Sequence, residues 1–363
     1  MKIKKITPAV IPALIIIAAF AVLFINNNNI DNAEKAQKNV TEPAYRSYPI
    51  MGTWAEISLY GDKKDTDKAF DIVQKTFNEV NNTCSRFKKD SELSELNRTA
   101  AAKPFKCDEM LWDVLLKSKF FYELSDGAFD VTITPLMELW GFFRKQNKIP
   151  SHAQIKNALD KVGLNKVVFN DEEHSIFFKN KDIEIDLGGI AKGYAVDLAY
   201  DAIKNLNIKA GVINLGGNIR TFPKPPPGRN YYSIGVRDPF DKDKIMNGTV
   251  KILGKSLATS GDYEQFVVIN GERFTHIINP KTGYPIKDMA ADTIISDSAL
   301  WADGLSTSVF LNGEEFASKI HRKYPNIDIL VIRGYKDTPA SIKITKLGKV
   351  WEQIEEPLNE YIK

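Results

Sequence analysis

The stretch from Asp186 to Asp197 constrains the fold of this chain more than any other. It reads Asp-Leu-Gly-Gly-Ile-Ala-Lys-Gly-Tyr-Ala-Val-Asp. Apolar alternation predicts a short strand over 183–187, and apolar spacing after Ile190 predicts a helix that runs to about residue 205. Glycines between a strand and a helix let the backbone approach a ligand, and the first N–H groups of a helix have no partner inside it. The pattern therefore fits an anion site, and it fits an ordinary strand-to-helix turn equally well.

Lys192 adds a positive charge in the first turn of this predicted helix. A mobile ammonium group at a helix N-terminus suits a phosphate. Two common nucleotide motifs are excluded. Lys192 is followed by Gly193 rather than Ser or Thr, so this is no Walker A loop, and the G-x-G-x-x-G spacing of dinucleotide-binding folds is absent.

The composition narrows the class of protein. Of the 363 residues, 43% are hydrophobic and 26% are charged, as in folded globular proteins. A net charge of +3 without a basic stripe argues against a nucleic-acid partner. Cys84 and Cys107 could pair, although no pattern requires it, and four histidines argue against a multi-histidine metal centre. Any bound metal is therefore expected to have oxygen ligands.

The N-terminus carries a separate signal. Three lysines among the first five residues precede an apolar run over 9–25, which only Pro12 interrupts. Such a run meets the lower limit for a membrane-spanning helix, and no clear cleavage site follows it. We expect residues 1–25 to be an uncleaved membrane anchor rather than a cleaved signal segment, and residues 26–44 to be a polar tether. The leading lysines would then keep the N-terminus in the cytoplasm, with residues 45–363 outside, on the periplasmic or extracellular face of the membrane.

Beyond this segment, helices and strands are mixed rather than strictly alternating, which favours an α+β fold over a doubly wound sheet. Helical spacing predicts helices over 67–87, 108–127, 190–205, 298–310 and 314–323. Apolar runs predict strands over 55–60, 167–169, 175–178, 210–213, 231–236, 249–253, 265–269, 273–278, 293–296, 328–332 and 341–344. Asn270-Gly271 is a type I′ hairpin signal between two of these strands.

Three glycine-rich or small polar segments each follow a predicted strand. They lie at 186–193, 214–218 and 259–262. One such turn is common, whereas three in one half of a chain suggest backbone folded around a polar ligand. Three independent tight turns remain the alternative.

Two further places could carry chemistry. Asp303 and Thr307 are four residues apart on a predicted helix, so both side chains lie on one face and could ligate Mg²⁺. Such a pair is usually solvated, but its apolar neighbours indicate burial, and a buried polar pair needs a partner. His276 lies on a predicted strand, where it is either structural or serves as a proton acceptor or flavin contact.

Together these motifs resemble the ApbE family of FAD:protein FMN transferases. The resemblance extends over about residues 47–344, and the motifs occur in the family's order. The six motifs are Met51-Gly52-Thr53, Gly127 to Thr132, Asp186 to Asp197, Asn214 to Asn218, Thr275 to Gly283 and Ala302 to Thr307.

The resemblance implies a two-lobed α+β fold, with antiparallel sheets and flanking helices, that binds FAD in a cleft between the lobes. It implies Mg²⁺-dependent transfer of FMN from FAD, through a phosphoester bond, to a Thr or Ser hydroxyl of an acceptor protein, with release of AMP. Acceptors in the family are subunits of membrane redox complexes or extracellular electron-transfer proteins. They carry a segment resembling Asp-Gly-x-Thr-Gly-Ala-Thr, which this chain lacks, so self-flavinylation is not expected.

The resemblance also implies roles for single residues. The positions that match FAD contacts are Met51, Phe87, Ala128, Phe129, Asp130, Asp186, Lys192, His276 and Ile277. The positions that match the Mg²⁺ site are Gly189, through its carbonyl, Asp303 and Thr307. The catalytic positions are His276 and Asp303. Family members are often lipoproteins with an N-terminal cysteine, and this chain has none there.

Two other functions fit the same residues. In an FAD pyrophosphatase, water would replace the acceptor hydroxyl and the products would be FMN and AMP. In a flavin-binding protein without catalysis, no metal would be needed at the pyrophosphate. The presence of Asp303 and Thr307 argues against the second alternative.

Overall fold

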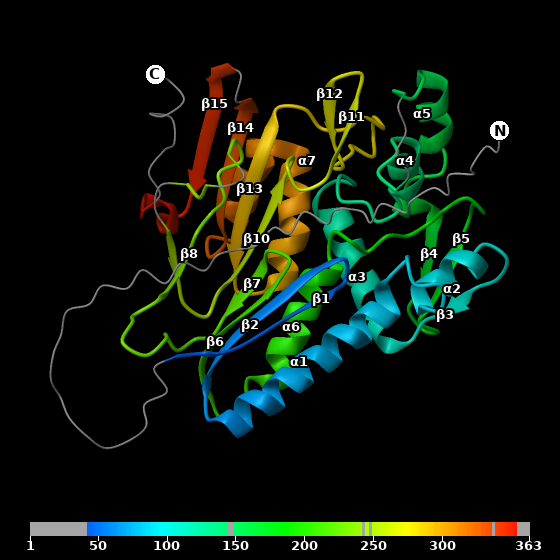
Figure 1. Ribbon diagram of the computed structural model, residues 1–363. Helices are drawn as coiled ribbons and strands as arrows, with labels where there is room; N and C mark the ends of the chain where they lie inside the picture. The colour runs from blue at the N-terminus through cyan, green and yellow to red at the C-terminus, as the bar shows by residue number, and fades with distance from the viewer. Residues whose placement is uncertain (1–41, 144–147, 242–243, 247–248, 336–337, 354–363) are drawn as a thin grey trace, which may run out of the picture.

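The computed structural model describes residues 42–143, 148–241, 244–246, 249–335 and 338–353 (Figure 1). No helix within these ranges is both long enough and apolar enough to cross a membrane. The expected anchor over 1–25 and most of the expected tether lie outside the described residues.

A large antiparallel sheet organises the described part of the chain (Figure 1). Its order is β1-β2-β6-β7-β10-β13-β14-β15, and each neighbouring pair is antiparallel. The strands are β1 (Ala44–Ile50), β2 (Thr53–Gly61), β6 (Ile208–Leu215), β7 (Asn218–Thr221), β10 (Ser256–Gly261), β13 (Met289–Ser296), β14 (Asp328–Tyr335) and β15 (Thr338–Leu347).

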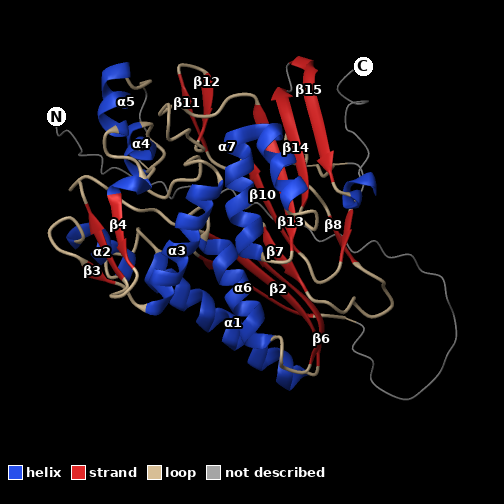
Figure 2. Ribbon diagram, turned by 180° about the vertical axis from the view of Figure 1, so that it is seen from behind, coloured by secondary structure: helices blue, strands red, loops and turns tan. Residues whose placement is uncertain are grey.

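Long helices cover one face of this sheet (Figure 2). They are α1 (Lys63–Cys84), α6 (Ala191–Ile203) and α7 (Ala299–Lys323). In α1, residues three or four apart, such as Phe70, Val73 and Phe77, are buried, so the apolar stripe predicted from the sequence is the face that packs. In α7, Gly313 with a φ of 74° interrupts the helical backbone. The two helices predicted over 298–310 and 314–323 therefore lie on either side of this break.

Smaller elements pack beside this layer, around a three-stranded sheet in the order β3-β5-β4. They are α2 (Glu92–Thr99), β3 (Phe105–Lys106), α3 (Glu109–Leu124), α4 (Thr134–Leu139), α5 (His152–Leu159), η1 (Leu164–Lys166), β4 (Val167–Asn170) and β5 (Ser175–Phe178). The hairpins β8 (Tyr232–Ile234) with β9 (Val250–Ile252), and β11 (Phe266–Ile269) with β12 (Glu272–Thr275), and the turn η2 (Lys349–Gln353) complete the described elements. The expected α+β class with antiparallel sheets and flanking helices is confirmed.

The buried apolar residues fall into a large cluster and a small one. The large cluster joins the main sheet to its helices. The small one lies between α4, α5 and β12, around Trp140, whose indole N–H donates to the carbonyl of Gly283 at 2.8 Å. This arrangement fits two lobes, and their exact division stays a prediction.

Three local predictions are wrong. Residues 183–187 form no strand. The side-chain amide of Asn97 pairs with both the N–H and the carbonyl of Ile185 (2.9 Å each), in place of the backbone of a neighbouring strand. Residues 259–261 lie within β10, where they pair with β13, and are no turn. His276 follows β12 and is not part of a strand. The hairpin at Asn270-Gly271 is confirmed, since both residues have positive φ (53° and 82°) as a type I′ turn requires.

Candidate functional site

The turn before α6 is closed by its own residues. The Asp186 carboxylate accepts a hydrogen bond from the N–H of Gly188 at 2.7 Å, and Lys192 Nζ donates to the Gly188 carbonyl at 2.8 Å. Behind the turn, Arg86 Nε lies 3.7 Å from the other oxygen of Asp186. Burial raises the pKa of Asp186, and the Gly188 hydrogen bond and Arg86 oppose this. The turn is therefore held in shape without a ligand.

Helix α6 obtains its N-terminal cap from another helix. Its first flanking residue, Ile190, provides no side-chain cap, and the N–H of Gly193 donates instead to Asp303 Oδ2 of α7 at 2.9 Å. A Cβ atom on Gly193 would lie 2.3 Å from the carbonyl oxygen of Ala299. Glycine is therefore required for α6 and α7 to approach this closely.

The cap is reciprocal. Asp197 of α6 accepts hydrogen bonds from the N–H groups of Ala299 (2.8 Å) and Leu300 (2.9 Å) and from the hydroxyl of Ser298 (2.6 Å), at the start of α7. Each helix thus supplies a carboxylate to the positive end of the other. This double cap fixes Asp303 relative to the 186–193 turn.

Three predicted Mg²⁺ ligands gather at this junction. A Cβ on Gly189 would lie 3.4 Å from Thr307 Oγ1, and Thr307 is one helical turn beyond Asp303. Within the described residues, neither Thr307 Oγ1 nor Asp303 Oδ1 has a hydrogen-bond partner, and Lys192 Nζ is 3.9 Å from Asp303 Oδ2. No group of three or more His, Cys, Asp or Glu in the described ranges could hold a metal by itself. The available donors are a carboxylate, a hydroxyl and a backbone carbonyl, a set that fits Mg²⁺.

Two titratable side chains lie within electrostatic reach of Lys192. Burial raises the pKa of Glu264 to about 7, Lys192 lowers it and Asp303 raises it. The Glu264 side chain is nevertheless open to solvent. Glu264 thus carries a solvent-accessible carboxylate that senses the charges of both Lys192 and Asp303.

Burial likewise lowers the pKa of His276 to about 4, and the charge of Lys192 adds to this effect. His276 Nδ1 lies 3.0 Å from the carbonyl oxygen of Gln265. Because a carbonyl can only accept, Nδ1 carries the hydrogen and Nε2 of the neutral ring has a free lone pair. His276 can therefore accept a proton or a hydrogen bond at Nε2.

Aromatic rings lie around Arg86 and His276. Phe87 is 70% exposed, and the Arg86 guanidinium packs over the rings of Phe87 (5.0 Å) and Phe143 (4.3 Å). The neighbouring Phe142 has its ring centre 6.5 Å from that of His276. An exposed ring supported in this way is suited to stack on a planar ligand.

The comparison with known proteins now decides the family. The model of the ApbE family matches residues 51–331. This chain belongs to the ApbE family.

Individual members of the ApbE family are similar to this chain over most of their length. The FAD:protein FMN transferase of Haemophilus influenzae is 31% identical over 311 residues, which cover 82% of this chain and 90% of that protein. The FAD:protein FMN transferase of Escherichia coli K12 is 28% identical over 296 residues, which cover 80% and 84%. The solved flavin transferase ApbE from Vibrio cholerae has a TM-score of 0.76 and 27% identity, covering 86% of this chain and 99% of its own. The ApbE protein of Thermotoga maritima gives a TM-score of 0.76 and 28% identity, covering 87% and 100%.

The site residues predicted from the ApbE motifs lie in different settings. Phe129 packs at the turn, since its ring would be 3.4 Å from a Cβ on Gly189. Asp130 uses both oxygens within its own neighbourhood, accepting from the N–H and hydroxyl of Thr132 and from the N–H of Leu164. Its carboxylate therefore holds the loop, and burial raises its pKa.

In the described ranges, the other residues predicted to contact FAD have no direct polar interaction with the Asp186, Lys192 and Asp303 side chains. Met51 is in the turn between β1 and β2 with a φ of 52°, Ala128 is buried, and Ile277 is buried beside His276. Among the described residues, the hydrogen bonds and ion pairs that join Asp186, Lys192 and Asp303 include none of these three side chains.

Sequence reasoning missed three residues of this ApbE-family site: Asp197, Arg86 and Glu264. Asp197 could have been noticed as the acidic end of the Asp186–Asp197 motif. Arg86 and Glu264 have no local pattern, because their partners are distant in sequence.

Proposed function

We propose that this chain transfers the FMN moiety of FAD to a Thr or Ser hydroxyl of an acceptor protein, through a phosphoester bond, and releases AMP. The main support is the meeting of Gly189, Lys192, Asp303 and Thr307 at one helix junction in a member of the ApbE family. The relatives named FAD:protein FMN transferase are similar over about four fifths of the chain.

Lys192 and the turn before α6 would bind the pyrophosphate of FAD. The Lys192 ammonium has three hydrogens, and one is used at the Gly188 carbonyl. The others can meet phosphate oxygens beside the positive end of α6. The exposed ring of Phe87 would stack on the isoalloxazine ring.

The Asp303 carboxylate, the Thr307 hydroxyl and the Gly189 carbonyl would hold Mg²⁺. When bound, Mg²⁺ would neutralise negative charge on the pyrophosphate as it is split. The protein's part is to present these oxygens in a fixed arrangement, and the bond from Gly193 to Asp303 serves this purpose.

The acceptor hydroxyl must lose its proton as it attacks phosphorus. We assign this proton to His276 Nε2, since Nδ1 is committed to Gln265. The low pKa of His276 arises from burial and from Lys192, and the negative charge of a bound pyrophosphate would oppose the effect of Lys192. A general base is most effective when its pKa lies near the working pH.

The decisive experiment incubates the protein with FAD and Mg²⁺, with and without an acceptor domain that carries Asp-Gly-x-Thr-Gly-Ala-Thr. AMP and free FMN are measured by chromatography, and protein-bound flavin by gel fluorescence. A transferase gives AMP and labelled acceptor in equal amounts. Equal AMP and free FMN whether or not acceptor is present would instead mean FAD pyrophosphatase, and no AMP would mean flavin binding alone.

We also propose that residues 1–25 anchor the protein in the cell membrane, with the catalytic part outside the cytoplasm. The apolar run over 9–25 and the lysines before it support this. Protease added to intact spheroplasts should remove the catalytic part. Full protection there, with digestion only after lysis, would contradict the proposal.

A further inference from the structure

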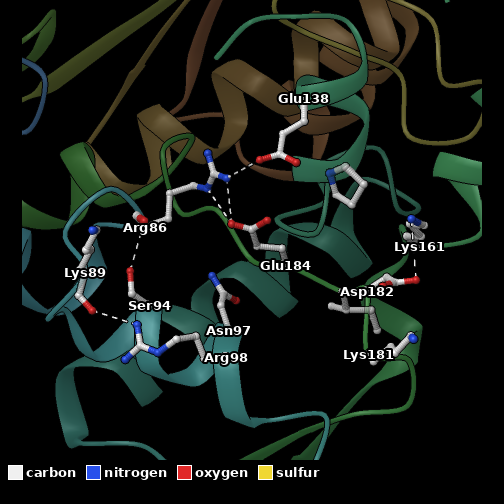
Figure 3. Close-up of a pocket in the computed structure, with 12 residues that line it drawn as sticks. Arg86, Lys89, Ser94, Asn97, Arg98, Glu138, Lys161, Lys181, Asp182 and Glu184 are labelled. Carbon is white, nitrogen blue, oxygen red and sulfur yellow. Dashed lines mark hydrogen bonds and ion pairs between the residues drawn. The ribbon is translucent and has the colours of Figure 1, made fainter. Parts of the chain in front are cut away.

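A cavity of about 490 Å³ opens beside the candidate site (Figure 3). Its walls come from Arg86 and Lys89, from α2, from α4, from Lys161 and from residues 181–184. The last of these segments runs directly into Asp186. The charged side chains that matter for its chemistry are Arg86, Lys89, Arg98, Glu138, Lys181 and Glu184.

The acidic groups of this cavity are already paired. Arg86 Nη2 lies 3.3 Å from the Glu138 carboxylate and 2.8 Å from the Glu184 carboxylate. Asp182 lies 3.7 Å from Lys161 Nζ. Glu138 and Glu184 share the one charge of Arg86, but the lining as a whole still holds five cations against three carboxylates.

Three cations in the wall have no such partner. Lys89, Arg98 and Lys181 form no ion pair with a carboxylate in the part of the chain that the structure describes, and Arg98 donates a hydrogen bond to the Lys89 carbonyl at 2.9 Å. All three are exposed. Figure 3 shows Lys89 and Arg98 on one side of the cavity and Lys181 on the opposite side. The cavity thus presents positive charge to solvent from two walls.

This cavity shares a wall with the candidate site. The Arg86 side chain is only 8% exposed and lies between the cavity and Asp186, 3.7 Å from its carboxylate. A second cavity, of about 580 Å³, shares Pro135, Glu138 and Lys161 with the first and continues along α4 and α5. The two cavities therefore adjoin along α4, and the first lies next to the turn proposed to bind FAD.

We propose that Lys89, Arg98 and Lys181, here termed the cationic pocket, dock an acidic segment of the acceptor protein. The proposal rests on the proposed function and names the surface that selects its protein substrate. A protein acceptor has to bring one hydroxyl to the 186–193 turn, so its neighbouring residues must lie on the enzyme surface beside that turn. Opposite charges on the two surfaces speed the encounter and fix its orientation. The FAD phosphates, in contrast, are placed at Lys192, on the other side of the Arg86–Asp186 pair.

The test reverses two charges of the pocket in the full chain, with Arg98→Glu and Lys181→Glu combined. The acceptor domain described above is the substrate, and initial rates of labelling are measured against its concentration at 50 and 300 mM NaCl. We expect the KM for acceptor to rise about tenfold at low salt, as for loss of electrostatic steering, with kcat and the Kd for FAD unchanged. The difference from wild type should shrink at 300 mM NaCl, because salt screens exposed charges.

Lys64→Glu is the matched control. Lys64 is exposed near the first turn of α1, and about 30 Å of helix separates it from the α1 end that leads to Arg86. It reverses one charge outside the pocket, as each of the two substitutions does inside it, so its KM should stay near that of wild type.

Three results would overturn the proposal. The first is an unchanged KM for acceptor in the double variant, and the second is an equal rise of this KM in Lys64→Glu. The third is a higher Kd for FAD in the double variant, which would show that the pocket holds FAD. Should the double variant fail to fold, Arg98→Gln with Lys181→Gln must raise KM in the same direction. If wild type labels no acceptor, the proposed function fails separately. Calorimetric binding of the acceptor domain to wild type and to both variants then decides the docking proposal.

Discussion

Replacing Asp303 by Asn should separate the two roles that the structure gives this residue. Asp303 Oδ2 caps α6 through the N–H of Gly193, while Oδ1 has no hydrogen-bond partner among the described residues. An asparagine has nearly the same shape and volume, and its side-chain oxygen can still accept from Gly193. The substitution therefore removes the charge and keeps the cap.

The expected loss of stability is small. Asn and Asp are comparable N-caps, so the main loss is the interaction of a charge with the helix dipole, about 0.3–1 kcal/mol. For a domain of this size, that corresponds to a fall in Tm of no more than about 4 °C. Asp303→Ala, by contrast, leaves the Gly193 N–H without a partner, at a cost of about 1–3 kcal/mol. Asn should thus be clearly the more stable of the two variants.

The expected loss of activity is large. A carboxylate that offsets Mg²⁺ acts on charge that develops in the transition state, where removal of one electrostatic group costs about 10²–10³ in kcat. The assay is in-gel flavin fluorescence of an acceptor domain, titrated with Mg²⁺, beside Tm measurements for each variant.

Asp197→Asn is the control for capping, because Asp197 caps the other helix of this junction and is not among the proposed Mg²⁺ ligands. Asp197 accepts three hydrogen bonds through both oxygens, so its Asn variant loses at least one of them. It should lower Tm and leave the dependence of labelling on Mg²⁺ unchanged. If Asp303→Asn labels acceptor as fast as wild type at every Mg²⁺ concentration, the metal is held elsewhere and the reasoning is refuted.

Three further predictions concern the same junction. Lys192→Ala should weaken FAD binding about 10- to 100-fold, the equivalent of a lost hydrogen bond to a charged group, and an unchanged Kd by flavin fluorescence quenching would remove Lys192 from the site. Gly193→Ala should lower the free energy of unfolding by about 1–3 kcal/mol, because the new Cβ lies 2.3 Å from the Ala299 carbonyl oxygen. In the control variant Gly189→Ala the new Cβ meets nothing closer than 3.4 Å, so its Tm should stay near that of wild type. Equal Tm values for the two variants would contradict the packing argument. Without FAD and Mg²⁺, Glu264→Gln should raise Tm at pH 8 and change it little near pH 4.5. The pKa of Glu264 in the folded protein, about 7, lies above the ordinary value of 4.5, so the ionised carboxylate destabilises the fold at high pH and this cost disappears as the pH falls. An equal Tm difference at both pH values would contradict this reasoning.

Local patterns predicted the elements that depend on local interactions. The helix after Asp108 occurs as α3, and the hairpin at Asn270-Gly271 occurs with the expected backbone. In both cases the signal is set by neighbours in sequence, namely an apolar stripe for α3 and a pair of residues that tolerate positive φ for the hairpin. Asp108 stands at the N-cap position of α3, but its side chain makes no capping hydrogen bond. The antiparallel main sheet, by contrast, could be expected only as a class, because the pairing of β2 with β6 joins residues far apart in the chain.

The failed strand over 183–187 shows why pattern alone was insufficient. Its apolar residues alternate, and Ile183, Ile185 and Leu187 are indeed buried. The backbone hydrogen bonds of this segment, however, join Ile185 to the side chain of Asn97, and they join the N–H groups of Ile183 and Asp186 to the carbonyls of Asn180 and Val131. Alternation reports which side chains are buried, and it does not report which groups satisfy the backbone.

In the candidate site, too, the sequence indicated which residues matter but not the hydrogen bonds that hold them. The resemblance named Asp303, Thr307 and Gly189, but nothing in the sequence indicated that Asp303 caps α6 while Asp197 caps α7. A side chain held only by packing could turn away, whereas Asp303 is held by a hydrogen bond from a buried N–H that has no other acceptor among the described residues. The residue proposed to bind the metal is thus also part of what joins the two helices. We therefore expect a substitution that separates α6 from α7 to destabilise the junction and to disrupt the proposed Mg²⁺ ligands together.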